Sequence, residues 1–269
     1  MRFTPYHPLT AQPFRHDSGY AEFAPCDALK PYVRCFWVSE RNTLGSGLVI
    51  PDSCTDIILT FHADGSAPDA VFCGPDDRPS ADFAALQPER FAIRFYAWTT
   101  AAFTRETMCA LRNGRIPAEA MFPRIHETLA LPLQRARGLR ERITLSEAWL
   151  LDRLRPERIP TLVLSAVEAM LDCGGSLRVS DLGRAVHLSS RQLERVFAGS
   201  VGISPKQLCR VIRYQHVWHA ALAPGFHPVE EAMRLGFYDQ SHLLHEFTLM
   251  HGESLSHALL RAGSSSDSG

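Results

Sequence analysis

Hydrophobic and β-branched residues come in short runs along the first part of the chain. The clearest runs are 32–39 (YVRCFWVS), 55–62 (TDIILTFH) and 91–98 (FAIRFYAW), and proline and glycine gather between them. Runs of this length and composition, separated by turn residues, predict β-strands. Helical spacing of apolar residues returns at 101–112. We therefore predict a mixed, β-rich domain over residues 1–125.

The pattern then becomes helical over residues 126–174. Apolar residues at 139–154 follow helical spacing, and a second amphipathic stretch covers 162–171. Gly174 and Gly175 follow, and a glycine pair is typical of a break in the chain. We predict three domains and a tail: 1–125, a helical linker at 126–174 that can also serve dimerisation, an all-α domain at 175–262, and a disordered tail at 263–269 (GSSSDSG).

The all-α domain begins with two short helices joined by a tight turn. Ser189 is a good N-cap for the second helix, because Gln192 three residues later completes a capping box. Leu193 and Phe197 form the apolar face of this helix. A polar, arginine-bearing outer face is typical of the second helix of a helix-turn-helix. That face carries Ser190, Arg191, Glu194 and Arg195.

The same pattern occurs a second time further along the chain. The apolar pair of the first unit recurs fifty residues later as Leu243 and Phe247, behind a cap at Asp239. Between the units a helix is predicted over 204–222, and a helix of that length spans roughly 28 Å. Successive major grooves on one face of DNA are ~34 Å apart. A purely structural helical bundle is the alternative, but two aligned units favour DNA binding through two helix-turn-helix units. Together with the β-rich first domain, they predict an α+β protein.

These segments closely resemble the DNA-binding domain of the AraC/XylS family of bacterial transcription regulators. The resemblance is carried by LSSRQLERVFAGSVGISPKQL, RYQHVWHAAL and GFYDQSHLLHEF, within about 85 residues. It implies seven helices, with two recognition helices in adjacent major grooves of double-stranded DNA, and RNA polymerase as a partner. By position, the residues that would read bases are Arg191, Glu194 and Arg195 in the first unit, and Gln240, Ser241, His242 and His245 in the second.

The second unit departs from the family pattern. The family commonly has arginine where His245 stands, a basic residue near Thr248 and proline where Leu255 stands. These departures predict a weaker grip on phosphates by the second unit. Residues 1–125 are also similar to the N-terminal domain of one AraC-like subgroup, through IPDSCTDIIL, FCGP and AIRFYAW. No ligand follows from that similarity.

Composition agrees with a globular, DNA-binding protein. The hydrophobic fraction of the 269 residues is 45%, and the formal net charge is −1. Residues 175–262 carry 9 basic and 7 acidic side chains, a mild shift toward the charge that DNA binding needs. The first residues lack the apolar core of a signal peptide, and no run reaches the ~18 apolar residues of a membrane span. We therefore expect a cytoplasmic protein without membrane contact.

The seven cysteines are scattered, with no C-x-x-C pair, so we expect neither a disulfide framework nor a zinc site. Cys54 and Cys73 could form a redox sensor, although buried inert thiols are commoner. His242 and His245 lie three residues apart on a helix, a spacing that could also bind a metal. No HExxH, GxSxG, P-loop or Rossmann motif supports an enzyme. We expect no catalytic residue, cofactor or metal; an enzyme, or an adaptor that does not bind DNA, is the alternative.

The strand at 55–62 suggests how the first domain could sense a small molecule. One of its faces is mostly apolar, and the other carries polar groups at a spacing of two. Small-ligand sites combine apolar walls with a few placed polar groups. We predict that Asp56 and His62 face an effector pocket, with Trp37 or Trp98 as a wall. Alternatively, Asp56 caps the preceding turn and His62 is solvated.

Overall fold

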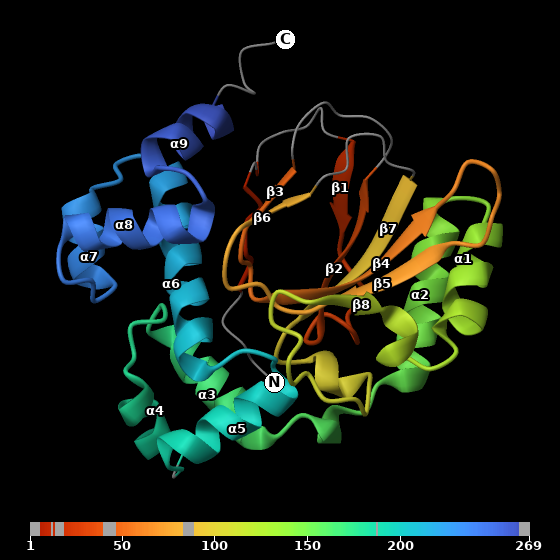
Figure 1. Ribbon diagram of the computed structural model, residues 1–269, viewed down its shortest axis with the longest axis horizontal. Helices are drawn as coiled ribbons and strands as arrows, with labels where there is room; N and C mark the ends of the chain where they lie inside the picture. The colour runs from red at the N-terminus through yellow and green to blue at the C-terminus, as the bar shows by residue number, and fades with distance from the viewer. Residues whose placement is uncertain are drawn as a thin grey trace.

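The computed structural model describes residues 6–11, 13, 19–39, 47–82, 89–186 and 188–263. Within these residues the first half of the chain builds an antiparallel sheet and the second half builds helices (Figure 1). The α+β class predicted from the sequence is therefore confirmed. Residues 264–269 of the predicted disordered tail lie outside the described residues.

The three predicted runs become neighbouring strands of one sheet. The strand order is β1-β2-β7-β4-β5-β8, and each pair of neighbours is antiparallel. A separate two-stranded ribbon pairs β3 with β6. The strands are β1 (Tyr20–Phe23), β2 (Val33–Ser39), β3 (Gly47–Val49), β4 (Cys54–Phe61), β5 (Asp69–Cys73), β6 (Ser80–Asp82), β7 (Glu89–Tyr96) and β8 (Arg115–Pro117).

The helix predicted at 101–112 is wrong. After a 3₁₀ turn at Thr100–Ala102 the chain continues as turns and loops up to β8. The Met108 N–H donates to the carbonyl of Gly199 at 2.9 Å and the Asn113 N–H to that of Pro75 at 3.0 Å, so these two groups bond to other segments. Ala110 and Asn113 also have positive φ, which a helix excludes.

Alternation along the strands gives the sheet two different faces. Phe36, Ile57 and Ile93 are fully buried on one face. Helices α1 (Leu131–Arg135) and α2 (Leu139–Arg153) cover this face (Figure 1) and add Leu133, Trp149 and Leu150 to its core. The remaining helical turns of this part are Ala118–Ala120, His126–Ala130 (a π-helical turn) and Pro156–Arg158.

The C-terminal half contains two helical units joined by the long helix α6. Capping boxes at Ser189 and Ser204 begin α5 and α6, as the sequence predicts for Ser189. Each unit buries its repeated apolar pair, Leu193 with Phe197 and Leu243 with Phe247. The helices are α3 (Thr161–Asp172), α4 (Val179–Ala185), α5 (Ser190–Ser200), α6 (Pro205–Leu222), α7 (Pro228–Arg234), α8 (Gln240–His251) and α9 (Leu255–Gly263).

Helix α3 packs against the first helical unit. Val163 and Val167 are fully buried and share one hydrophobic cluster with Leu193 and Phe197. With α3 included, the described C-terminal region has the seven helices that the family resemblance implies. Helix α3 thus shares a core with the first helical unit across the boundary predicted at 174.

The sheet and the helical half also share a core. Trp98 is 1% exposed and belongs to the same cluster as Phe197, together with Tyr6 from the first residues of the chain. A polar contact adds to it, since the Gln207 side chain donates to Asp77 at 2.6 Å. None of the helices in the described part of the chain is both long and apolar enough to cross a bilayer.

Candidate nucleic-acid interface and sheet-face cluster

Helix α5 presents a polar face on the first unit. Its start is fixed by Ser189, whose hydroxyl accepts the Gln192 N–H at 3.3 Å while the Gln192 side chain accepts the Ser189 N–H at 3.0 Å. Leu193 and Phe197 hold its inner side in the core. The four predicted DNA-contacting residues therefore point outward and are all exposed: Ser190, Arg191, Glu194 and Arg195.

Helix α8 presents the corresponding face on the second unit. The carboxylate of Asp239 caps it by accepting the His242 N–H at 2.8 Å. Gly252 ends it in the left-handed conformation, with φ +86°. The four predicted residues of this unit are also exposed: Gln240, Ser241, His242 and His245. Each unit thus carries one capped helix with an outward polar face.

The turn before α8 holds one of these residues in place. Phe237 is 9% exposed and fills the core of the unit. Gly236 before it has φ +69°, which favours glycine. The ring of His242 lies edge-on to Phe237, with 5.4 Å between centroids, and its Nδ1 accepts the Tyr238 N–H at 3.2 Å. The turn therefore fixes the orientation of the His242 ring.

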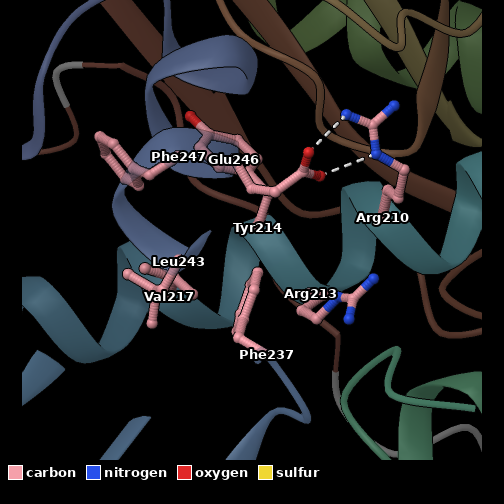
Figure 2. A pocket seen from close by; sticks show the side chains of 8 residues that line it. All are labelled: Arg210, Arg213, Tyr214, Val217, Phe237, Leu243, Glu246 and Phe247. Atoms are coloured by element: carbon pink, nitrogen blue, oxygen red, sulfur yellow. Dashed lines mark hydrogen bonds and ion pairs between the residues drawn. The ribbon is translucent and has the colours of Figure 1, made fainter. Parts of the chain in front are cut away.

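Helix α6 holds the second unit through both charged and apolar contacts. Figure 2 shows a pocket between α6 and this unit, lined by Arg210, Arg213, Tyr214, Val217, Phe237, Leu243, Glu246 and Phe247. In it, Arg210 and Glu246 form a double ion pair, with 2.9 Å and 3.3 Å between nitrogen and oxygen atoms. The guanidinium of Arg213 lies over the Phe237 ring at 4.8 Å.

A second cluster occupies the face of the sheet opposite α1 and α2. The guanidinium of Arg94 donates from Nε and Nη2 to both oxygens of Asp56, at 2.9 Å and 3.2 Å. Its Nη1 is 3.2 Å from a carboxylate oxygen of Asp52. The indole of Trp37 also donates to Asp56, at 2.9 Å. Cys35, Trp37 and Ala92 form a small apolar cluster on this face.

Burial and charge together set the protonation of these groups. The side chains of Arg94, Asp56 and Asp52 are only 14%, 13% and 17% exposed. Burial raises the pKa of Asp52 to about 6, although the charge of Arg94 opposes this. Burial alone would lower the pKa of Arg94, but the two carboxylates hold it above its usual range. The cluster therefore contains one permanent cation and one carboxyl that titrates near neutral pH.

The structure separates the four residues predicted for an effector pocket. Trp37 and Asp56 lie in contact on the sheet face. Trp98 lies instead in the core shared with the helices, where its ring stacks on Tyr96 with 5.1 Å between centroids. His62 follows the end of β4 and pairs with exposed Asp69 at 3.0 Å. Neither belongs to the cluster: Trp98 packs against helices remote in sequence, and His62 bonds to a nearby exposed residue.

The structure also changes the interpretation of the turn before β4 and of the two cysteines. Asp52, not Asp56, caps the turn by accepting the Cys54 N–H at 2.9 Å. Burial raises the pKa of Cys73 to about 12 and that of Cys54 well above its usual value. Reactive thiols need a lowered pKa, so these values do not favour the redox-sensor alternative. Among the described residues, no group of three or more potential ligands gathers around a metal position.

Sequence reasoning missed Arg94 and Asp52. Arg94 stands between isoleucine and phenylalanine in the run FAIRFYAW, and a charge inside such a strand usually needs a buried partner. That signal points to Arg94 but does not name Asp52, because β-sheet pairing brings the two together. The same face also carries an ion pair between Arg34 and Glu22, at 3.2 Å.

Two family models match the chain. Residues 182–261 match one described as a helix-turn-helix domain, and residues 21–117 match a domain of unknown function, DUF6597. The first match spans both helical units from α4 to α9. No curated protein sequence matches the chain.

Several solved structures are similar to the chain. A transcriptional regulator from Chromobacterium violaceum, described among AraC-type DNA-binding domain-containing proteins, is 19% identical with a TM-score of 0.35, over 40% of this chain and 96% of that one. ToxT from Vibrio cholerae is 10% identical with a TM-score of 0.41, over 84% and 98%. CdpR from Pseudomonas aeruginosa is 15% identical with a TM-score of 0.31, over 66% and 46%.

Proposed function

We propose that α5 and α8 are the two recognition helices of this chain, as a DNA-binding transcription regulator of the AraC/XylS type. Each would enter one of two successive major grooves on the same face of an operator. The residues that would reach the DNA are Ser190, Arg191, Glu194 and Arg195 from α5, and Gln240, Ser241, His242 and His245 from α8.

One observation carries this assignment: two capped helices expose polar faces, and a single rigid helix joins their units. Helix α6 has 18 residues, which corresponds to about 27 Å of helix. With the flanking turns, this length suits the ~34 Å between successive major grooves. Arginine on α5 suits bidentate contacts to guanine. On α8 the reading groups are amide, hydroxyl and imidazole, so its grip on phosphates is proposed to be weaker.

Footprinting of the full-length chain on its own genomic fragments tests this function. We expect two protected segments about 10 base pairs apart on one face of the DNA. A variant with Arg191→Ala and Arg195→Ala should lose the segment under α5. Arg184→Ala is the matched control, because Arg184 is 81% exposed and lies on α4 instead. Equal loss in the control, or a footprint over only one groove, contradicts the proposal.

We also propose that the sheet face around Trp37 senses a small-molecule effector. An aromatic wall, small apolar neighbours and an ordered group of charges are what a selective small-ligand site contains. Of the four residues predicted from the sequence, Trp37 and Asp56 stay in this proposal, joined by Arg94 and Asp52. Homodimerisation through the N-terminal half is the alternative role for this domain.

The other partners follow from operator binding. A protein that reads an operator acts where the chromosome lies, so we propose the cytoplasm as its place of action. RNA polymerase is the proposed protein partner, since transcription is what the bound regulator would change. The role assigned to the chain is binding, and no reaction is assigned to it.

A further inference from the structure

We propose that the ion pair between Arg210 and Glu246 fixes the rotation of α8 relative to α6, and thereby sets the half-site spacing that the chain accepts in DNA. The inference rests on the proposed binding of α5 and α8 in successive grooves. Arg210 and Glu246 are positioning residues in this view, because they act through the recognition helix and not by touching a base.

The pair has the geometry that fixes an orientation. Both guanidinium nitrogens that face α8 bond to the carboxylate, Nε to Oε2 at 2.9 Å and Nη2 to Oε1 at 3.3 Å. The side chains are 31% and 22% exposed, so solvent screens them only in part. A double contact of this kind restricts angle as well as distance.

The position of Glu246 on α8 connects the pair to the DNA-facing residues. Glu246 directly follows His245 and lies one helical turn after His242. Any rotation of α8 about its own axis would carry Glu246 away from Arg210 and turn both histidines by the same angle. The ion pair therefore controls where the polar face of α8 points.

A second cation of α6 holds the turn in front of α8. Arg213 follows Arg210 by three residues, and its guanidinium lies 4.8 Å from the centroid of the Phe237 ring (Figure 2). Burial lowers the pKa of Arg213. Phe237 in turn carries His242 edge-on. Helix α6 thus holds the second unit at its turn and at its recognition helix.

The remaining contacts between α6 and α8 would allow α8 to pivot. Val217, Leu243 and Phe247 belong to one apolar cluster, and the Phe247 ring lies 5.5 Å and 5.7 Å from those of Tyr214 and Trp218. Apolar contacts have little directional preference. The hydrogen bond between Tyr214 and His251, at 2.8 Å, fastens only the far end of α8. Without the Arg210–Glu246 pair, these contacts would leave α8 free to rotate about its own axis by a limited angle.

Orientation matters because DNA is helical. Inserting one base pair between two half-sites rotates the second site by roughly 35°, since one turn holds about 10 base pairs. A rigidly held α8 can enter the major groove of the second half-site at only one such spacing. A loosened α8 would bind at spacings one base pair longer or shorter with a smaller loss of affinity.

The test measures spacing preference with full-length protein. Affinity is measured for the natural operator and for operators with one base pair inserted or removed between the half-sites. For the wild type we expect about a tenfold or larger loss at the altered spacings. Arg210→Met and Glu246→Gln should reduce this loss to about threefold or less, while affinity for a single α5 half-site stays unchanged.

Two further variants complete the test. Arg234→Met removes an ion pair with Glu231, 2.8 Å long and confined to α7, and should keep the wild-type preference. Arg210→Glu combined with Glu246→Arg should restore it. Undiminished spacing preference in the single variants, or relaxed preference in both Arg234→Met and the exchanged pair, overturns the inference. Wild-type protein with no spacing preference contradicts two-groove binding itself, and the inference with it.

Discussion

Gln215 on α6 donates a hydrogen bond to the carbonyl oxygen of Pro51 in the loop before β4, at 2.7 Å. The same amide accepts the Leu9 N–H at 2.8 Å and donates to the Leu9 carbonyl at 3.2 Å. Gln215 is fully buried. One side chain therefore ties the helix between the DNA-binding units to two segments of the N-terminal half.

Replacing Gln215 with leucine should destabilise the full-length protein. The substitution fills a similar volume but removes the partner of the buried Pro51 carbonyl and of the part-buried Leu9 backbone groups. Each such group costs ~1–3 kcal/mol, so we expect a loss of about 3 kcal/mol in the free energy of unfolding, measured by urea denaturation. Gln134→Leu is the control, because its bonds to Gly65 and Ser66 are exposed. Equal losses in the two variants would refute a special role for Gln215.

Arg195→Ala should weaken specific DNA binding more than nonspecific binding. Arg195 is exposed on the same polar face of α5 as Arg191, one helical turn away. If its contact is bidentate to guanine, its loss costs roughly 1–3 kcal/mol for the operator. Affinities for operator and for scrambled DNA of the same length give the measurement. An equal fall in both would identify Arg195 as a phosphate contact only.

Local signals explain why so much of the C-terminal half could be predicted from the sequence. The cap at Ser189 and the buried pair Leu243 and Phe247 depend on residues within two helical turns of one another. The central strands were also predictable, since their apolar runs are continuous. In both cases the residues that define an element are neighbours in the chain.

The errors share the opposite cause, because they depend on contacts between distant segments. Trp98 belongs to the interdomain core only because α3 and Tyr6 pack there. Arg94 meets Asp52 and Asp56 through pairing of β7 with β4. The sequence marks these residues as unusual but does not say what surrounds them.

Phe237→Ala should destabilise the second helical unit. The ring is 9% exposed and also supports the Arg213 guanidinium and the His242 ring. Truncating a buried phenylalanine costs ~3–5 kcal/mol, and we expect about 3 kcal/mol here because one edge is open. The adjacent Tyr238→Ala is the control, since Tyr238 is 91% exposed. Urea denaturation measures both, and similar small losses in the two variants would contradict the packing.

A fragment that starts before α3 should fold better than one that starts at the glycine pair. The fragment 175–262 lacks Val163, Val167 and Met170, which are fully buried against the first unit. Burial of each such side chain contributes ~1.5–3 kcal/mol. We expect 157–262 to melt cooperatively and 175–262 to melt at a lower temperature or without cooperativity. Equal melting curves by circular dichroism would instead support the boundary at 174.

Asp52 should make stability depend on pH in the acidic to neutral range. Burial raises its pKa to about 6 in the folded chain, compared with ~3.9 for an unperturbed aspartate. The folded state therefore binds this proton more tightly than the unfolded state. The resulting stability is fully present below about pH 4 and is lost as the pH rises through about 6, a change of roughly 3 kcal/mol.

Asp52→Asn isolates this contribution. The amide keeps an oxygen that can accept the Cys54 N–H but no longer titrates. We expect the unfolding free energy of the wild type, minus that of the variant, to fall by roughly 3 kcal/mol from about pH 3 to pH 7. Contributions from other titrating groups are shared by the two proteins, so they largely cancel in the difference. A difference that stays constant over this range would mean that Asp52 titrates at its ordinary pKa, and that the Arg94 charge balances the effect of burial.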